Sequence, residues 1–386
     1  MKIGILTFNW AINFGAVLQM YALYSFLNEN TDHEIFVINY SPKSLTEPYS
    51  LKVFEKPFKF KKIIKRIVLK PIKSEQHRKF DKFKIENLKL TEFIEDKKEF
   101  EKQLEDFDLI IVGSDQVWNH DITKNNSDEY LLSNINVEKI SYAASFGSDS
   151  IRDEFIQYYK ENLKNFHSIS LREKISQKTQ NALGLENYNL SLDPVFLLDK
   201  KEWIRLAEKS EYKLPKNQFI LIYMLEKNEE LLKDALYLSK KYNLPVYSIE
   251  IIGLRRYLRE YNVKGLHDLG PYDFLNFFQR ATYILTNSFH GVSFSLILNK
   301  NFISYSHSKV NSRLENILRI YGIDKYQIKN ELQDKEELIE ILNNNGIASR
   351  NENHIKKYIE DSKKYLIDTI EKISNGRIND EKSCNE

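Results

Sequence analysis

Apolar runs of strand length alternate with longer helical stretches through the first half of the chain. Lys2–Phe8 is expected to form a buried strand, Ala16–Leu27 a helix and Ile35–Asn39 the next strand. Further strand-like runs occur at Leu109–Val112, Ile140–Phe146 and Ser168–Leu171. Because parallel strands joined by helices give this alternation, the pattern predicts a mainly parallel, Rossmann-like sheet.

The alternation breaks between residues 192 and 217 and then resumes. Apolar strands are expected at Phe219–Leu225, Val246–Ile252, Tyr283–Thr286 and Phe302–Tyr305. A helix at Glu229–Tyr242 separates the first two of them. We therefore predict an α/β fold of two Rossmann-like domains facing a cleft. Their boundaries are 1–205 and 218–330, and a helical, charged tail follows at 331–386.

Composition narrows the class of protein. The 57 Lys and Arg residues nearly balance 55 Asp and Glu residues, which argues against a dedicated nucleic-acid binder. The single cysteine, Cys384, excludes a disulfide framework and fits a reducing compartment. The N-terminus lacks the pattern of a signal peptide, and no apolar run approaches the roughly 20 residues that cross a bilayer. The expectation is a soluble, cytoplasmic protein.

Residues 52–84 are strongly basic. This segment carries 13 Lys or Arg residues with five phenylalanines between them. One interpretation is peripheral contact with an anionic membrane at its inner face, since each basic residue near such a surface contributes about 1 kcal/mol. The alternative is a solvated helical face whose apolar side chains pack on the domain.

The clearest candidate for chemistry is His290, which follows the strand Tyr283–Leu285 and precedes an apolar helix. Ligands bind at such strand ends in open α/β sheets. An imidazole there can act as a general acid or base, and the helix start, flanked by Ser288 and Gly291, offers N–H groups to an anion. A structural histidine is the competing interpretation.

Two further loops follow predicted strands and contain candidate sugar ligands. In the first, Gly15 permits close approach and Asn13 offers an amide, although Asn at this place is often only a helix cap. In the second, Ser114 and Asp115 can bind sugar hydroxyls, and Trp118 can supply an apolar platform. The alternatives are a turn or cap role for Asp115 and a core position for Trp118.

Three cations follow other strands. Arg172 is a candidate clamp for a carboxylate or phosphate, with a surface ion pair to Glu173 as its alternative. Lys309 and Arg313 are candidate phosphate ligands or simply residues of an exposed helix start. The motifs for dinucleotides, P-loop nucleotides, serine hydrolases and metals do not occur, so we predict no metal and no bound cofactor.

Taken in order, six blocks of sequence resemble the polysaccharide pyruvyl transferase family. They are Lys2–Phe8, Asn13–Gln19, Gly113–Asn119, Tyr142–Gly147, Leu192–Val195 and Thr286–Gly291. The resemblance spans residues 1 to about 320 and implies a two-domain fold similar to that of GT-B glycosyltransferases.

The resemblance also implies an activity: transfer of pyruvate from phosphoenolpyruvate onto two hydroxyls of a sugar, giving a cyclic ketal. It implies catalytic roles for His290 and Arg172. Donor contacts are expected from Arg172, Lys309, Arg313, Ser288 and Gly291. The N-terminal domain is expected to hold the acceptor through Asn13, Gly15, Ser114, Asp115 and Trp118.

The expected partners are phosphoenolpyruvate as co-substrate and a sugar or lipid-linked oligosaccharide of bacterial exopolysaccharide, capsule or cell wall polysaccharide. No nucleic acid is expected. The main alternative is a GT-B glycosyltransferase that uses a nucleotide sugar, because the same fold serves that chemistry. A sugar-binding protein without catalysis is the second alternative.

Overall fold

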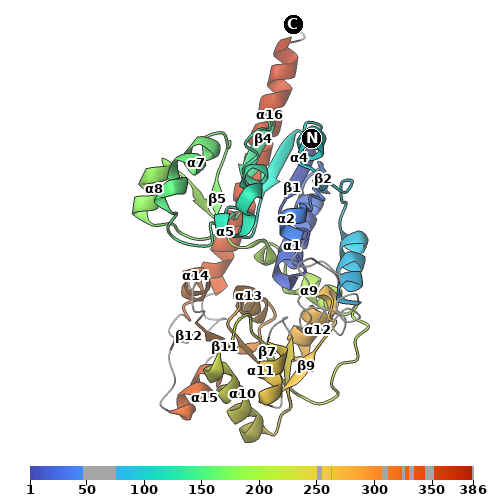
Figure 1. Cartoon of the computed structure of the whole chain (residues 1–386), viewed down its shortest axis with the longest axis vertical. Helices are drawn as coiled ribbons and strands as arrows, with labels where there is room; N and C mark the ends of the chain where they lie inside the picture. The colour runs from blue at the N-terminus through green and yellow to red at the C-terminus, as the bar shows by residue number, and fades with distance from the viewer. Residues whose placement is uncertain are drawn as a thin grey trace, which may run out of the picture. The chain divides into compact units, whose positions relative to one another are not determined.

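The computed structural model describes residues 1–46, 75–249, 254–261, 263–306, 312–323, 327–329, 334–343 and 352–384. The chain forms two compact units (Figure 1). Unit 1 comprises Met1–Tyr49, Asn87–Leu197 and Lys356–Glu386, and unit 2 comprises Ser50–Glu86 and Leu198–Ile355.

Unit 1 is built on a four-stranded parallel sheet of order β2-β1-β3-β4. Its strands are β1 (Lys2–Leu6), β2 (Glu34–Val37), β3 (Leu109–Val112) and β4 (Glu138–Ser141). A short parallel pair, β5 (Ser170–Leu171) and β6 (Asn189–Leu190), continues it through single bridges such as Ile140 to Ser168. The parallel sheet predicted from the alternation is confirmed.

The central helix of unit 1 is α1 (Phe14–Asn30), which is buried through most of its length. The other helices are α2 (Lys43–Thr46), α4 (Lys97–Leu104), α5 (His120–Thr123), α6 (Ser127–Leu131), α7 (Asp153–Leu163), α8 (Gln177–Leu183) and α16 (Glu352–Cys384), with 3₁₀ turns η2 (Lys124–Asn126) and η3 (Pro194–Phe196). An apolar core containing Ile110, Val112 and Trp118 joins the sheet to helices such as α1, α4 and α7.

Unit 2 contains a six-stranded parallel sheet of order β12-β11-β10-β7-β8-β9. Its strands are β7 (Ile220–Tyr223), β8 (Val246–Ile249), β9 (Lys264–Leu266), β10 (Tyr283–Thr286), β11 (Asn301–Tyr305) and β12 (Gln327–Ile328). Two of the predicted strands, β7 and β10, lie side by side at its centre, in register from Tyr283 opposite Ile220 to Thr286 opposite Tyr223.

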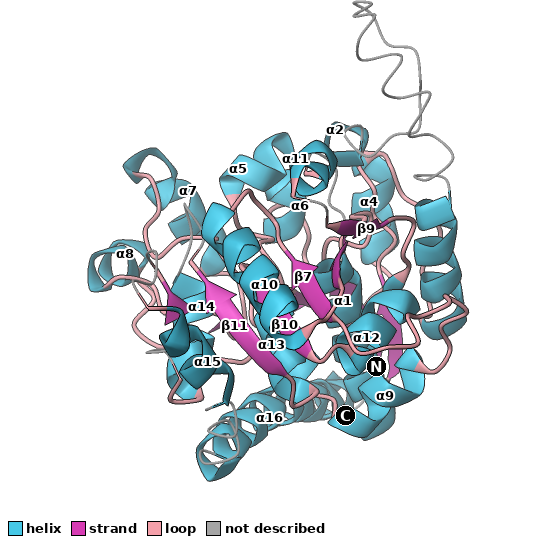
Figure 2. Ribbon diagram, turned by 90° about the horizontal axis from the view of Figure 1, so that it is seen from below, coloured by secondary structure: helices cyan, strands magenta, loops and turns pink. Residues whose placement is uncertain are grey.

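Helices cover both faces of the second sheet. They are α9 (Lys200–Ala207), α10 (Glu229–Tyr242), α11 (Arg255–Glu260), α12 (Pro271–Arg280), α13 (Phe289–Ile297), α14 (Ser312–Ile320), α15 (Lys335–Asn343) and the helix 75–87. α10 lies against β7, β8 and β10 (Figure 2). On the opposite face Tyr223 packs edge-on against Phe274 of α12.

The units are not contiguous in sequence as the predicted domains were. The predicted tail contributes α16, which from Lys356 onward belongs to unit 1. Residues 75–86, expected in the N-terminal domain, belong to unit 2. Residues 52–74 of the basic segment lie outside the described residues, so the structure does not address membrane contact there.

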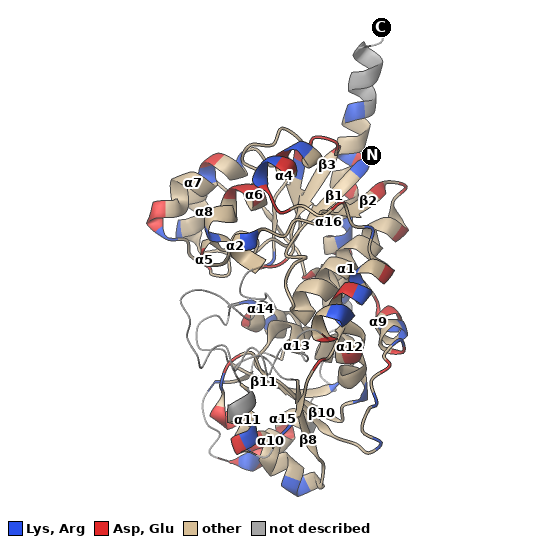
Figure 3. Ribbon diagram, turned by 45° about the vertical axis from the view of Figure 1, so that its right-hand side comes forward, with Lys and Arg blue, Asp and Glu red and all other residues tan. Residues whose placement is uncertain are grey.

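Charge is mixed over the helices. Acidic and basic side chains follow one another along α4 and α10 (Figure 3). Among the described helices, none combines the length and apolar character required to span a bilayer.

Candidate functional site

In each sheet the chain first adds strands on one side of its first strand and then on the other side. The place between the two sides, called the switch point, lies between β1 and β3 in unit 1 and between β7 and β10 in unit 2. Ligands of open α/β sheets bind beyond the carboxyl ends of the strands at such points. The segment Gly113–Asn119 follows β3 and His290 follows β10, so each motif lies at the switch point of its own unit.

In unit 1, Ser114 is held by three hydrogen bonds. Thr7 Oγ1 donates to the carbonyl of Ser114 at 2.9 Å, and the N–H of Ser114 donates to Gln19 Oε1 at 3.2 Å. The Ser114 hydroxyl donates to the carbonyl of Ala143 at 2.8 Å. The Gln19 amide also donates to Thr7 Oγ1 and to the carbonyl of Ala16, both at 3.0 Å. We call the pair the Thr7–Gln19 clamp.

The clamp fixes a turn that presents Asp115. Gly113 and Asp115 both have positive φ, 120° and 75°, and a Cβ at Gly113 would collide with the carbonyl of Tyr142. The carbonyl of Asp115 accepts from Ser145 N at 3.0 Å, and its Oδ1 accepts from Gln116 N at 2.8 Å. With its side chain 16% exposed, Asp115 can still accept a hydrogen bond from a ligand hydroxyl.

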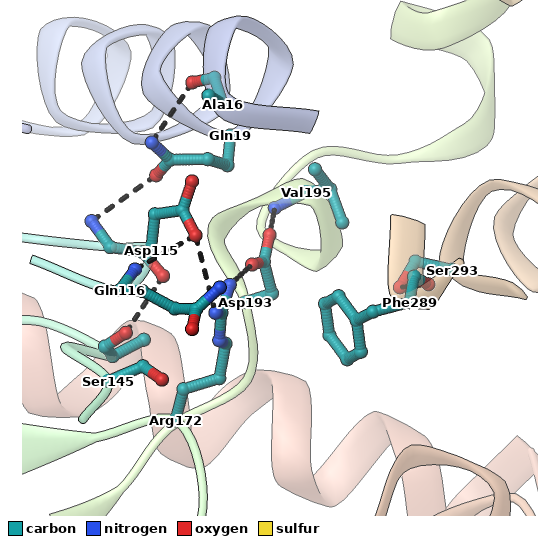
Figure 4. Close-up of polar contacts among 12 residues, drawn as sticks. Ala16, Gln19, Asp115, Gln116, Ser145, Arg172, Asp193, Val195, Phe289 and Ser293 are labelled. Atoms are coloured by element: carbon teal, nitrogen blue, oxygen red, sulfur yellow. Dashed lines mark hydrogen bonds and ion pairs between the residues drawn. The ribbon is translucent and has the colours of Figure 1, made fainter. Parts of the chain in front are cut away.

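Arg172 lies among three carboxylates. Its Nη1 donates to Asp193 Oδ2 at 2.7 Å, and its Nη2 is 3.5 Å from Asp115 Oδ1 (Figure 4). Its Nε is 3.9 Å from Glu173 Oε2. Burial alone would lower the pKa of Arg172, but the three carboxylates outweigh it and raise the pKa. One cation against three carboxylates gives the group a formal charge of −2, which does not favour a free anion.

The carboxylates themselves are held by unit 1. Asp193 caps η3 by accepting from Val195 N at 3.1 Å (Figure 4). Glu173 Oε1 accepts from the Ser145 hydroxyl at 2.5 Å. Next to Asp193, Leu192 N donates to Ser362 Oγ of α16 at 3.0 Å. The Arg172 group is therefore anchored by both the sheet and α16, unlike the surface ion pair considered from sequence.

Trp118 is placed in the core. Its side chain is 1% exposed, its Nε1 donates to the carbonyl of Tyr130 at 3.1 Å, and its ring packs on Phe146 and Phe166. No ring face is left for a pyranose. The core position considered from sequence fits, and the predicted sugar platform does not.

Asn13 and Gly15 begin α1. The Asn13 side chain accepts from Ala16 N at 3.2 Å, as a helix cap does. Gly15 is buried in the first turn of the helix. The helix-cap interpretation of Asn13 therefore describes the geometry, and acceptor binding by either residue stays a prediction.

In unit 2, β10 leads through two residues into α13. Ser288 is the N-cap, and its Oγ accepts from Gly291 N at 3.3 Å. His290 is the second residue of the helix and is half-buried, with its ring edge-on to Phe289 at 5.2 Å between centroids. The predicted placement of His290 at a strand-to-helix turn is confirmed.

The turn is tied to β7. Thr286 Oγ1 donates to the carbonyl of Tyr223 at 2.6 Å and accepts from Ser288 N at 3.0 Å. Asn287 Oδ1 accepts from Leu225 N at 2.8 Å. A Cβ at Gly291 would collide with Thr286 Oγ1, so only glycine lets α13 lie this close to the end of β10. These contacts fix the backbone that carries His290.

The remaining donor candidates are less informative. Arg313 lies in the first turn of α14 and is half-buried. Lys309 lies outside the described residues. Within the part of the chain that the structure describes, no three His, Cys, Asp or Glu side chains are arranged to hold a metal ion.

Two Rossmann-like units with parallel sheets define a GT-B-like fold, and solved structures share it. A UDP-GlcNAc 2-epimerase from Neisseria meningitidis, bound to UDP-GlcNAc, is 14% identical, with 96% of this chain and 100% of that chain covered and a TM-score of 0.50. A second UDP-N-acetylglucosamine 2-epimerase is 10% identical, with 95% of each chain covered and a TM-score of 0.50. At these identities the likeness shows the fold alone.

The sequence itself gives the family. The family model for polysaccharide pyruvyl transferases matches residues 13–309, a range that contains both switch-point motifs. The chain belongs to the polysaccharide pyruvyl transferase family and is accordingly a transferase. A comparison with curated proteins gave no significant match.

The sequence analysis identified Asp115 and Arg172 as candidates. It did not identify the residues that position them, which are Thr7 and Gln19 next to Asp115 and Asp193 next to Arg172. One signal was available. Gln19 is an amide within the apolar run Phe14–Leu23, and a buried polar side chain in such a run needs a specific hydrogen-bond partner.

Proposed function

We propose that this transferase moves pyruvate from phosphoenolpyruvate onto two hydroxyls of one sugar, forming a cyclic ketal during synthesis of a bacterial surface polysaccharide. The observation that carries the proposal is the position of His290 at the switch point of unit 2, in a chain of this family. A half-buried imidazole on a rigid turn suits proton transfer near neutral pH.

His290 serves as the general acid. Its imidazolium gives a proton to the methylene carbon of phosphoenolpyruvate, and the adjacent carbon becomes electrophilic. One sugar hydroxyl forms a C–O bond to that carbon. The second hydroxyl forms another as the C–O bond to phosphate breaks. Of the two hydroxyl protons, one returns to His290 and the other leaves with the phosphate.

The donor carries a carboxylate and a phosphate, which require cations and N–H donors. Lys309 and Arg313 take this role. Ser288 and Gly291 shape the start of α13 instead, because their N–H groups already donate to Thr286 Oγ1 and to Ser288 Oγ. Arg172 can bind the donor only if the donor displaces Asp115 from Nη2. The Asp115 oxygen is 3.5 Å from Nη2, and Nη1 is already bonded to Asp193. Asp115 holds an acceptor hydroxyl. The predicted acceptor contact of Ser114 does not fit, because Ser114 is buried and its N–H, carbonyl and hydroxyl are all hydrogen-bonded within unit 1.

Thermal unfolding with and without ligands tests the donor. Phosphoenolpyruvate at about a hundred times its Kd adds about 2.7 kcal/mol to the free energy of unfolding and raises Tm by several degrees. Stabilisation by a uridine or guanosine diphosphate but not by phosphoenolpyruvate would instead favour the nucleotide-sugar glycosyltransferase, which shares the fold.

The role of His290 is tested with His290→Gln, which keeps a side chain of similar length. Phosphate release with phosphoenolpyruvate and a sugar acceptor should fall by roughly 10²- to 10⁴-fold. The stabilisation by phosphoenolpyruvate should persist. Near wild-type turnover in this variant would remove His290 from the mechanism.

A further inference from the structure

A cationic pocket lies beside the start of α12 in unit 2. It encloses about 310 Å³ between the helix 75–87, the segment 209–213 and α12. Five cations line it, Arg78, Lys79, Lys82, Lys209 and Lys213, with three carboxylates, Glu75, Glu211 and Asp273. Five minus three leaves a formal surplus of two positive charges, so the lining favours an anionic ligand.

The pocket is organised by one buried carboxylate. Asp273, 4% exposed, accepts from Lys79 Nζ at 2.9 Å, from the Ser210 hydroxyl at 2.6 Å and from Gly270 N at 2.9 Å. These donors come from the three segments that form the walls. A Cβ at Gly270 would come within 2.6 Å of the Lys79 Cβ, which shows how closely the helix 75–87 approaches α12.

The other two carboxylates are held only by exposed pairs. Glu75 lies 2.7 Å from Arg78, and Glu211 lies 3.0 Å from Lys82. Such pairs contribute about 0–1 kcal/mol, so a phosphoryl ligand can take their place. Glu86, outside the lining, lies 4.0 Å from Lys82 and offsets part of its charge. The other cations of the lining therefore give the clearer test.

Two aromatic rings complete the walls. Lys79 Nζ lies 5.2 Å from the centroid of Tyr212, and Lys209 Nζ lies 5.5 Å from that of Tyr272. Tyr272 is itself fixed by a hydrogen bond from its hydroxyl to Glu86 at 3.0 Å. Charged donors beside aromatic faces suit a ligand that combines a phosphoryl group with a sugar or another apolar-faced group.

The pocket lies at the same edge of the sheet as His290. α12 starts just after the carboxyl end of β9, and α13 starts just after that of β10. β9 and β10 are three places apart in the strand order, which at ~4.8 Å per strand is about 14 Å. A ligand of a few sugar units can span such a distance.

We infer that this pocket binds the phosphoryl end of the acceptor, a phosphate or diphosphate ester that carries the sugar. The inference rests on the proposed function. The volume exceeds what one phosphate requires and is at the lower limit of ligand sites. A lipid-linked sugar and a nucleotide-linked sugar share this diphosphate chemistry.

Calorimetric titration of the full chain with inorganic pyrophosphate at low ionic strength tests the site. The double variant Lys209→Ala/Lys213→Ala should weaken binding at least tenfold. The matched control Lys201→Ala/Lys240→Ala removes two exposed lysines of unit 2 outside the lining and should stay within twofold of wild type. No binding by wild type, or equal loss in both double variants, would overturn the inference.

Two further titrants identify the source of the diphosphate. Farnesyl diphosphate binding more tightly than pyrophosphate, and depending on Lys209 and Lys213, would assign a lipid-linked acceptor. The same result with uridine diphosphate would assign a nucleotide-linked one. If neither gains over pyrophosphate, the pocket recognises the diphosphate alone, and the carried sugar lies outside it.

Failure of this inference is distinguishable from failure of the proposed function. His290→Gln should bind pyrophosphate like wild type, and Lys209→Ala/Lys213→Ala should keep its stabilisation by phosphoenolpyruvate. Loss of that stabilisation in the lysine variant would assign the pocket to the donor and overturn the inference. If pyrophosphate binds but phosphoenolpyruvate does not stabilise the protein, the anion site is supported and phosphoenolpyruvate is rejected as the donor.

Discussion

Arg172 Nη1 donates to Asp193 Oδ2 at 2.7 Å, and both side chains are buried, with 2% and 0% exposed. This pair joins the end of β5 to the turn that starts η3. Because Asp115 and Glu173 also face the guanidinium, removing the cation would leave three carboxylates close together. The Arg172–Asp193 pair therefore holds the carboxylates of the unit 1 site in their positions.

Replacing Arg172 should destabilise unit 1 strongly. Arg172→Met keeps the length of the side chain but leaves Asp193 buried without its cation, which should lower the free energy of unfolding by about 3–5 kcal/mol. Urea denaturation measures it. Asp193→Asn in the Arg172→Met background should recover part of the loss, because it removes the uncompensated charge. A double variant no better than Arg172→Met alone would contradict this account.

The Thr7–Gln19 clamp should affect turnover through the position of Asp115, because it holds the neighbouring residue Ser114. Thr7→Val keeps the shape of the side chain but removes the hydroxyl that donates to Ser114 and accepts from Gln19. We expect a loss of about 1–3 kcal/mol in stability. We also expect kcat to fall with little change in KM for phosphoenolpyruvate, because Asp115 loses its position. Thr7→Ser, which retains the hydroxyl, should restore both, and equal values for the two variants would exclude the clamp.

Gly291 should not tolerate a side chain. In Gly291→Ala the added Cβ would collide with Thr286 Oγ1, so α13 must move and carry His290 with it. We expect a lower Tm and a loss of pyruvyl transfer. The control is Gly376→Ala, at an exposed helical site of α16 where a Cβ meets nothing within 4 Å. That control should be neutral or stabilise by up to about 1 kcal/mol, and a similar effect of both substitutions would refute the explanation.

Asp128 should contribute to acid sensitivity. Burial alone would raise its pKa, but the Tyr158 hydroxyl at 2.6 Å and Lys97 at 3.2 Å outweigh burial and lower the pKa. A lowered carboxyl pKa stabilises the fold above the unfolded value, about 4, and this stabilisation is lost as the pH falls through the folded value.

The difference in unfolding free energy between wild type and Asp128→Asn should therefore be full at pH 7 and shrink below about pH 4. Denaturation curves at pH 7 and at pH 3 measure it. Asp106→Asn, at an exposed position, is the matched control. A difference that is constant with pH would mean that the Asp128 carboxylate gains nothing from its partners.

The sheet centres were predictable because apolar periodicity is a local property. Leu109–Val112 and Tyr283–Thr286 were predicted with the bounds that the structure has, and so was the helix Glu229–Tyr242. The composition of the units was less predictable. The assignment of 75–86 to unit 2 depends on contacts such as Lys79 with Asp273, nearly two hundred residues apart, which no local pattern encodes.

The site was predictable in its location but not in its charge balance. Strand ends followed by polar residues indicated the regions around Asp115 and His290. The roles of single side chains depended on partners distant in sequence. Trp118 packs on Phe166 and is part of the core. Arg172 keeps its charge, but Asp193 and the neighbouring carboxylates offset it, so it does not form the predicted anion clamp.

The division of unit 1 into three segments also has a consequence for how the chain is made. A ribosome releases all residues of unit 2 before the last segment of unit 1, Lys356–Glu386, has emerged. Until then, Leu192 N lacks Ser362 and the main-chain carbonyl of Ser141 lacks the Tyr365 hydroxyl. The main apolar core of unit 1 contains no residue of α16 and can form earlier, so the contacts of α16 are the last part of unit 1 to be made.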